Sequence, residues 1–97
     1  MPTYMSLFKL TDQGAKEIKE VPGNIKEAFK GIEALWGKLK DFYVVTGEYD
    51  FMGISEFPSD EVYMTNVLSV ISRGGVRATT MKAFSLEEFT EIVKKLP

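Results

Sequence analysis

The residues with the clearest chemical potential lie in Gly47-Glu48-Tyr49-Asp50, a stretch between two segments rich in β-branched and aromatic side chains. Asp50 could act as a general base or as an anion, with Tyr49 or Tyr43 donating a hydrogen bond to a ligand oxygen. A carboxylate must be desolvated before its pKa rises toward neutrality, which an exposed hairpin tip does not provide. The structural interpretation is favoured, because glycine supplies a positive-φ turn residue and aspartate accepts backbone N–H groups in turns.

Other polar residues interrupt apolar segments and are further candidates for ligand contacts. Ser6 and Ser55 fall among large apolar neighbours in their own strand phases. Arg77 lies inside a predicted strand, where a guanidinium must find a carboxylate, another anion or solvent. Pairing of Arg77 with Glu56 or with an acid of a second copy, or simple exposure at the start of its strand, is the favoured explanation.

Asp12 and Gln13 follow the first predicted strand, at a position that could line the mouth of a pocket. The competing interpretation gives this segment a capping role, in which Thr11 or Asp12 accepts a backbone N–H at the start of a helical turn. Capping is slightly preferred.

Composition excludes several classes of function. The net charge of −2 and the scattered lysines give no basic patch, so nucleic acid is not expected as a partner. The chain has no cysteine and no histidine, which removes thiol chemistry, the commonest general base and the commonest transition-metal ligand. No D-x-D-x-D-G loop is present. We expect no metal and no cofactor.

The N-terminal segment MPTYMSLFKL lacks the basic region and cleavage site of a secretory signal, and no apolar run approaches the length of a membrane span. The absence of cysteine is compatible with a reducing compartment. These features predict a soluble cytoplasmic protein with no membrane partner.

Periodicity and turn residues predict one domain with four strands and three main helices. The predicted strands cover residues 3–10, 41–46, 51–57 and 76–84, and the predicted helices begin at Asn24, Ser59 and Ser85. The order β-α-β-β-α-β followed by a C-terminal helix is that of the ferredoxin-like α+β fold. Residues 11–20 could add one or two helical turns.

The first long helix is predicted to begin at Asn24 and to end at Gly37. Val21-Pro22-Gly23 predicts a stop, and Asn24 with an acid three residues later resembles a capping box. Apolar residues at helical spacing place Trp36 on the buried face, and Gly37 is a plausible terminating residue.

The predicted strands are apolar in both phases rather than alternating cleanly with polar residues. A sheet with one wet face should alternate, so both faces require a cover. The favoured cover is a second copy, sheet against sheet, which gives a dimeric α+β barrel with a cavity between the sheets. The alternative is a monomer whose apolar face is partly shielded by the C-terminal helix.

Three segments together resemble the GYD-domain family: MPTYMSLFKLTDQG, KLKDFYVVTGEYDFMGISEFPSDE and VRATTMKAFSLEEF. The resemblance covers essentially the whole chain, and its most specific parts are residues 10–14 and the Gly47-x-Tyr49-Asp50 element. It implies a single ferredoxin-like domain, residues 1–97, related in architecture to small dimeric barrel proteins. It implies no particular activity.

Three functions remain open. The leading hypothesis is a homo-oligomeric domain that binds a small, apolar-bodied molecule in a pocket beside the sheet. The second is a cofactor-independent enzyme similar to monooxygenases of related barrel families, with Asp50 as base, which is an analogy at the level of the fold. The third is a structural or regulatory assembly module without a ligand.

Overall fold

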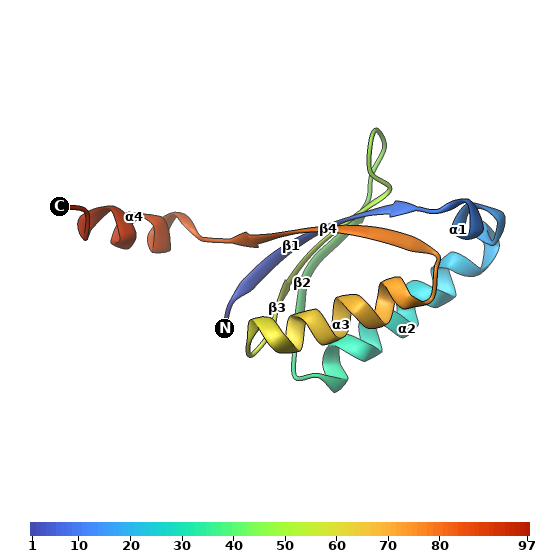
Figure 1. Cartoon of the computed structure of the whole chain (residues 1–97), viewed down its shortest axis with the longest axis horizontal. Helices are drawn as coiled ribbons and strands as arrows, with labels where there is room; N and C mark the ends of the chain where they lie inside the picture. Colours follow the sequence, from blue (N-terminus) through green and yellow to red (C-terminus); the bar gives the residue numbers. More distant parts are fainter.

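The computed structural model of the chain describes residues 1–97 and centres on a four-stranded antiparallel sheet (Figure 1). The strands are β1 (Thr3–Leu10), β2 (Lys38–Val44), β3 (Phe51–Glu56) and β4 (Val76–Ala83). Their spatial order is β2-β3-β1-β4, so the first strand lies inside the sheet while β2 and β4 form its edges.

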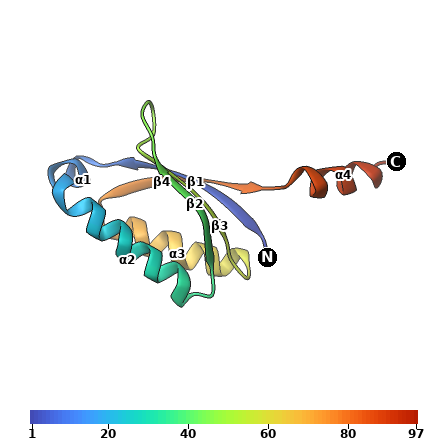
Figure 2. The ribbon, with the colours of Figure 1, turned by 180° about the vertical axis from the view of Figure 1, so that it is seen from behind.

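Helices cover only one face of this sheet. The helical elements of the chain are α1 (Asp12–Lys16), the short 3-10 helix η1 (Ile18–Glu20), α2 (Val21–Ala34), α3 (Asp60–Ser72) and α4 (Leu86–Lys94), of which α4 lies beyond the sheet (Figure 1). Helices α2 and α3 lie side by side under the sheet, whereas the loop joining β2 to β3 projects from the opposite face (Figures 1 and 2). The predicted ferredoxin-like α+β arrangement is confirmed.

Local signals account for several element boundaries. β1 covers the predicted residues 3–10. Helix α3 begins after Ser59, whose hydroxyl accepts a hydrogen bond from the Val62 N–H at 3.2 Å. Helix α4 begins with the predicted capping box, in which Ser85 and Glu88 each satisfy the other's backbone N–H.

The predicted boundaries of the first long helix are wrong at both ends. Helix α2 begins at Val21 rather than after Asn24, because Pro22 fits a first turn whose N–H groups need no intrahelical partner. Trp36 is 83% exposed at a φ of 62°, instead of packing on the buried face. Gly37 is required by space, since a Cβ there would lie 2.7 Å from the Phe57 ring.

Strand β2 also differs from its predicted range of 41–46. It begins earlier, at Lys38, and a bulge between Leu39 and Asp41 shifts its register against β3. Because a bulge moves the alternation by one residue, Leu39 can face the helices while the later part of the strand keeps its pairing.

The compact core lies toward the N-terminal end of β1. It is formed by Tyr4, Ile32, Phe57, Tyr63 and Val67, of which Phe57 is fully buried. The rings of Tyr4 and Tyr63 stack with centroids 4.1 Å apart, joining β1 to α3. Aromatic contacts of this kind add to the free energy gained by burial.

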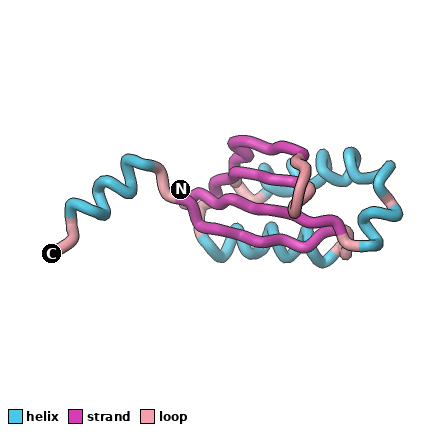
Figure 3. Tube along the Cα trace, turned by 90° about the horizontal axis from the view of Figure 1, so that it is seen from above, coloured by secondary structure: helices cyan, strands magenta, loops and turns pink.

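The middle of the other sheet face is mainly apolar and has no cover within the chain. Met5 lies between Ile54 and Met81 in the register, and Leu7 lies opposite Met52. Helix α4 extends beyond the end of β4 and does not lie over this open face (Figure 3). The alternative in which the C-terminal helix shields the sheet is therefore wrong.

Candidate functional site

The predicted site residues occupy four separate places rather than one. They divide between the helix-covered face, the open face, the β2–β3 loop and the start of α1. Ser6 and Ser55 are on the first, Tyr43 and Arg77 on the second, Tyr49 and Asp50 in the third, and Asp12 and Gln13 in the fourth.

A cavity of about 390 Å³ lies between the helix-covered face of the sheet and helices α2 and α3. The two-phase strands predict a cavity between two sheets, whereas this cavity lies within one chain, on the other side of the sheet. Its wall is mainly apolar, with side chains such as Phe8, Phe29, Phe51 and Val70. Its volume is within the range of small-molecule sites.

Small residues at the centre of the sheet create this space. Ser6 lies directly opposite Gly53, and Ser55 follows two residues later on the same face of β3. All three line the cavity and are buried. A Cβ placed on Gly53 would meet nothing closer than the Phe42 ring at 3.6 Å, so room for a side chain exists above it.

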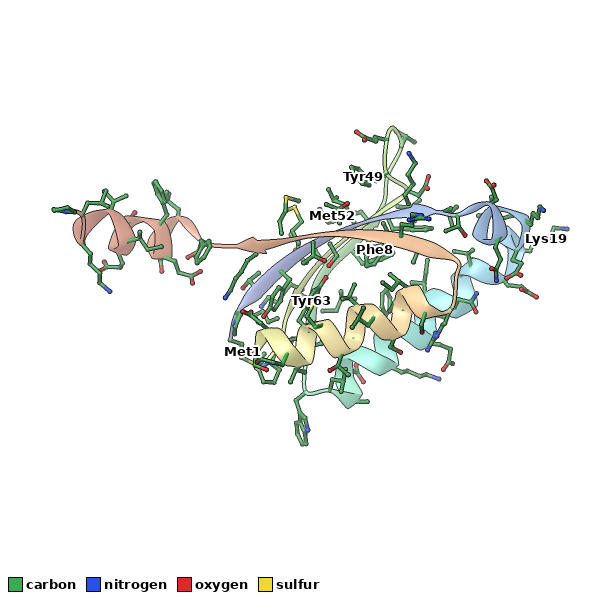
Figure 4. All side chains as sticks on the ribbon, in the orientation of Figure 1. Met1, Phe8, Lys19, Tyr49, Met52 and Tyr63 are labelled. Carbon is green, nitrogen blue, oxygen red and sulfur yellow. The ribbon has the colours of Figure 1, made fainter.

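Two hydroxyls of the cavity wall, those of Ser6 and Tyr63, belong to a short hydrogen-bonded chain that ends at Thr80, outside the wall. The wall also contains the charged and amide side chains of Glu17, Glu20, Asn24, Asn66 and Arg73. The Tyr63 hydroxyl lies 2.6 Å from Ser6 Oγ and 2.6 Å from Thr80 Oγ1, which links α3 to β1 and β4. Tyr63 points from α3 toward the sheet (Figure 4). The sequence analysis did not identify Tyr63 as a candidate, because residue spacing does not show which side-chain hydroxyls meet.

Ser55 differs from these hydroxyls because it has no partner in the protein. The residue is only 6% exposed, and its side chain forms no hydrogen bond within the chain. Every fully enclosed side-chain oxygen or nitrogen of the protein has a hydrogen-bond partner, so the Ser55 oxygen is not fully enclosed. Its oxygen therefore borders the cavity. A buried hydroxyl in this position favours a molecule that can donate to it or accept from it.

The Gly-x-Tyr-Asp element pins the β2–β3 loop to the end of β1. Asp50 Oδ2 accepts a hydrogen bond from the Leu10 N–H at 2.8 Å, and the Asp50 N–H donates to the Phe8 carbonyl at 2.9 Å. Gly47 has a φ of 106°, a conformation that favours glycine. The carboxylate thus accepts a backbone N–H, but from β1 rather than from within its own turn as predicted.

A second set of contacts ties the start of α1 to the glycine pair before β4. The Thr11 hydroxyl donates to the Gly74 carbonyl at 2.6 Å, and the Thr11 N–H donates to the Gly75 carbonyl at 3.0 Å. The same hydroxyl accepts from the Gly14 N–H at 3.1 Å, which confirms Thr11 as the cap. We call the joined contacts of Leu10, Thr11, Gly14, Asp50 and Gly74-Gly75 the loop clamp.

The other two predicted residues near the clamp, Asp12 and Gln13, are exposed. Gln13 Oε1 lies beside Gly74, at 2.8 Å from the position a Cβ would take there, and neither residue borders the cavity. Arg77 is exposed on β4 and Glu56 pairs instead with Lys40 at 3.9 Å, so the predicted Arg77–Glu56 pair does not form within the chain.

Two perturbed groups lie at the far end of β1, away from the cavity. The buried Tyr4 hydroxyl donates to the Asp60 carboxylate, which also pairs with Lys82 at 3.3 Å. The Tyr4 hydrogen bond and then Lys82 hold the pKa of Asp60 below its usual value. Burial, followed by the nearby carboxylate, raises the pKa of Tyr4. These shifts follow from a structural contact between β1 and α3.

The structure offers no group of acidic side chains suited to a metal ion. None of its helices combines the length and the hydropathy needed to cross a bilayer.

Comparisons with known proteins match the architecture described above. The profile of the GYD domain matches residues 4–93. The chain is 32% identical to the "Glutamine synthetase and cystathionine beta-lyase binding protein" of Thermus thermophilus over 95 residues, which are 97% of this chain and 100% of that protein.

Two solved structures illustrate how far the fold extends. Ribosomal protein S6 of Thermotoga maritima superposes with a TM-score of 0.63 at 17% identity, over 97% of this chain and 98% of that one. The leucine response regulatory protein of Mycobacterium tuberculosis gives a TM-score of 0.56 at 13% identity, over 87% of this chain and 51% of the regulator, so this chain spans about half its length. These likenesses concern the fold alone. By its sequence match across nearly all of its length, the chain belongs to the GYD-domain family.

Proposed function

We propose that this protein is a homo-oligomeric binding module that holds a small, apolar-bodied molecule with a polar group in the cavity between its sheet and helices. The observation that carries the proposal is the unpartnered, buried Ser55 hydroxyl in a mainly apolar wall. Sites for small molecules combine an apolar lining with a few well-placed polar groups in this way.

The hydrogen-bonded hydroxyls of Ser6, Tyr63 and Thr80 give such a ligand a polar group of fixed orientation. Tyr63 is held by Ser6 on one side and Thr80 on the other, so its hydroxyl is fixed in direction. Ser55 keeps its capacity to donate and accept. A ligand with a hydroxyl, amide or carbonyl group would satisfy Ser55 while its apolar body contacts the phenylalanine side chains.

The oligomeric part of the proposal is supported by the open face of the sheet. Met5, Leu7, Met52 and Ile54 share this face, and Tyr43 lies opposite Met52 on the neighbouring strand. Contiguous apolar surface of this kind marks interaction sites in soluble proteins. A second copy placed face to face would cover both apolar faces at once.

A second candidate function is protein binding. The relative from Thermus thermophilus is named as a binding protein for two enzymes, and that name favours a regulatory module whose open surface contacts another protein. The enzyme hypothesis has weaker support, because the carboxylate of Asp50 is committed to the backbone of β1.

The cavity is tested by titrating the protein with the fluorescent probe 8-anilinonaphthalene-1-sulfonate. Gly53→Leu fills the space above the sheet and is expected to weaken binding at least about tenfold, equivalent to roughly 1.4 kcal/mol. Gly53→Ala is the matched control, because its methyl group makes only ordinary contacts. Binding within about threefold of wild type is expected for the alanine variant.

Probe bound to the open face is identified with a further variant. Met52→Ser changes the opposite face, where Met52 lies above the sheet (Figure 4). It is expected to leave binding in the cavity unchanged. Binding that survives Gly53→Leu but is lost in Met52→Ser would place the probe on the open face and contradict the cavity proposal.

A further inference from the structure

Helix α4 is a preformed element whose apolar face has no partner in the chain. Its capping box satisfies the first backbone N–H groups, so the helix is defined by its own residues. Its large apolar residues, together with one just beyond its end, are all at least 44% exposed: Leu86, Phe89, Ile92, Val93 and then Leu96. They recur at helical spacing on one side, which is the pattern of a helix that packs against a surface.

The chain contains a second uncovered apolar surface, the open face of the sheet. The two surfaces are joined through β4, because Met81 belongs to the open face and α4 begins just beyond Ala83. One copy cannot bring them together, since α4 extends away from the sheet (Figure 1). In a dimer with a twofold axis, each copy can cover the open sheet face and the apolar face of α4 of the other copy.

Charge decides how the two copies are oriented. Lys9 and Arg77 lie directly opposite each other at one end of the open face, and neither forms an ion pair within the chain. The first turn of α4, at the other end of β4, carries Glu87 and Glu88 without a basic residue, whereas Glu91 further along the helix pairs with Lys94.

Two face-to-face arrangements are therefore unequal in energy. If the strands of the two copies ran in the same direction, the four basic side chains would meet at one end and the two acidic helix starts at the other. If the strands ran in opposite directions, the acidic start of each α4 would lie beside the basic end of the other copy. Opposite charges near an interface favour the second arrangement and set its register.

We propose that two copies of this chain associate through their open sheet faces with opposite strand directions, and that α4 of each copy packs against the Lys9–Arg77 end of the other. This inference rests on the second copy in the proposed function and names its contact. The exchanged helices extend the interface beyond the two sheets, and the partner copy buries apolar side chains that the monomer leaves in water.

The first test compares two substitutions in α4 of the full chain. Phe89→Asp places a charge on the apolar face, whereas Thr90→Asp places the same charge outside that face. We expect Phe89→Asp to raise the dimer dissociation constant at least about tenfold in sedimentation equilibrium. The Thr90→Asp variant should stay within about threefold of wild type. A monomeric wild-type protein, or equal dissociation constants for the two variants, would overturn the proposal.

The second test reads the orientation by cross-linking, which is clean because the chain has no cysteine. Ala15→Cys labels α1, beside the Lys9–Arg77 end, and Glu91→Cys labels α4. A mixture of the two variants with a short bis-maleimide should give covalent heterodimers. Covalent dimers from Glu91→Cys alone would show that the two α4 helices meet each other, which contradicts the arrangement.

Failure of this inference can be told apart from failure of the proposed function. The probe titration with Gly53→Leu reports on the cavity, and sedimentation with Phe89→Asp reports on α4. If Phe89→Asp still forms a dimer and Gly53→Leu still loses the probe, the cavity and the second copy stand and the helix exchange is wrong. If wild type is a monomer, the second copy in the proposed function is wrong as well.

Discussion

The loop clamp and the cavity adjoin, because Leu10, Gly14 and Gly75 of the clamp line the cavity, but the polar groups of the two regions are used differently. In the clamp, Asp50 and Thr11 satisfy backbone groups of three separate segments at distances of 2.6–3.1 Å. In the cavity, Ser55 is buried with no partner, and Gly53 leaves room that no side chain fills. Asp50 of the Gly-x-Tyr-Asp element therefore joins separate segments of the chain, while small residues leave the cavity open.

The comparison teaches that a conspicuous motif and a binding site need not coincide. Gly-x-Tyr-Asp attracts attention because aspartate and tyrosine can do chemistry, yet its carboxylate is already bound to the Leu10 N–H. Substitution of Asp50, which does not line the cavity, should thus change stability and leave ligand binding alone. Substitutions in the cavity should do the reverse.

The largest effect is expected for Gly14→Val, in the clamp. A Cβ on Gly14 would lie 2.1 Å from the Gly75 carbonyl oxygen, and that backbone cannot move without breaking its bond to Thr11. We expect a loss of at least about 3 kcal/mol in the free energy of unfolding, measured by urea denaturation. Gly23→Ala is the control, because no atom lies within 4 Å of its Cβ position in α2, and should stabilise by about 0.5–1 kcal/mol. A folded, fully stable Gly14→Val protein would show that the clamp is not tight.

Asp50→Ala should have the next largest effect. It leaves the Leu10 N–H without its acceptor and is expected to lower the free energy of unfolding by about 1–3 kcal/mol. Asp50→Asn keeps an acceptor oxygen and should lose less. Probe affinity of the folded Asp50→Ala protein should match wild type. A stable Asp50→Ala protein that cannot bind the probe would instead make the motif part of the site.

Tyr4→Phe tests a contact outside both regions through its pH dependence. The lowered pKa of Asp60 contributes stability above the usual aspartate value, and this is lost as pH falls through the lower folded-state pKa. The raised pKa of Tyr4 contributes stability below the usual tyrosine value of about 10, and this is lost as pH rises above it. The stability difference between wild type and Tyr4→Phe should therefore be greatest near neutrality and shrink below about pH 4 and above about pH 10. Thermal melts across this range would reveal a constant difference if the hydroxyl did not contact Asp60.

The smallest change in stability is expected for Ser55→Ala, in the cavity. Because the Ser55 hydroxyl has no partner in the protein, removing it should alter the free energy of unfolding by no more than about 0.5 kcal/mol. If a ligand uses this hydroxyl, its affinity falls while stability stays constant. A large loss of stability in Ser55→Ala would show that the hydroxyl is already bonded within the fold.

Most of the fold could be predicted because it depends on local signals. β1, α3 and α4 are marked by apolar periodicity and by Ser59 and Ser85 as caps, and these residues act within one turn of where they stand. The start of α2 was missed because Pro22 and Gly23 can stop a helix or begin one, depending on what precedes them.

The site was less predictable because it depends on contacts between distant segments. Ser6 and Ser55 could be named as polar interruptions, but their phase alone did not tell which face of the sheet they occupy. The role of Gly53 arises only from its position opposite Ser6, and the Tyr63–Thr80 contact joins residues of α3 and β4. The need for a glycine at position 14 is likewise explained only by the close approach of the Gly75 backbone.

The position of Trp36 determines what optical spectroscopy can report on this protein. It is the only tryptophan, and its indole is already in water in the folded chain. Its emission should therefore have a long-wavelength maximum that moves little when the protein unfolds, and near-ultraviolet circular dichroism of the stacked Tyr4–Tyr63 pair will follow unfolding better. The same exposure makes iodide quenching of Trp36 a direct reporter of whether another molecule covers the end of α2.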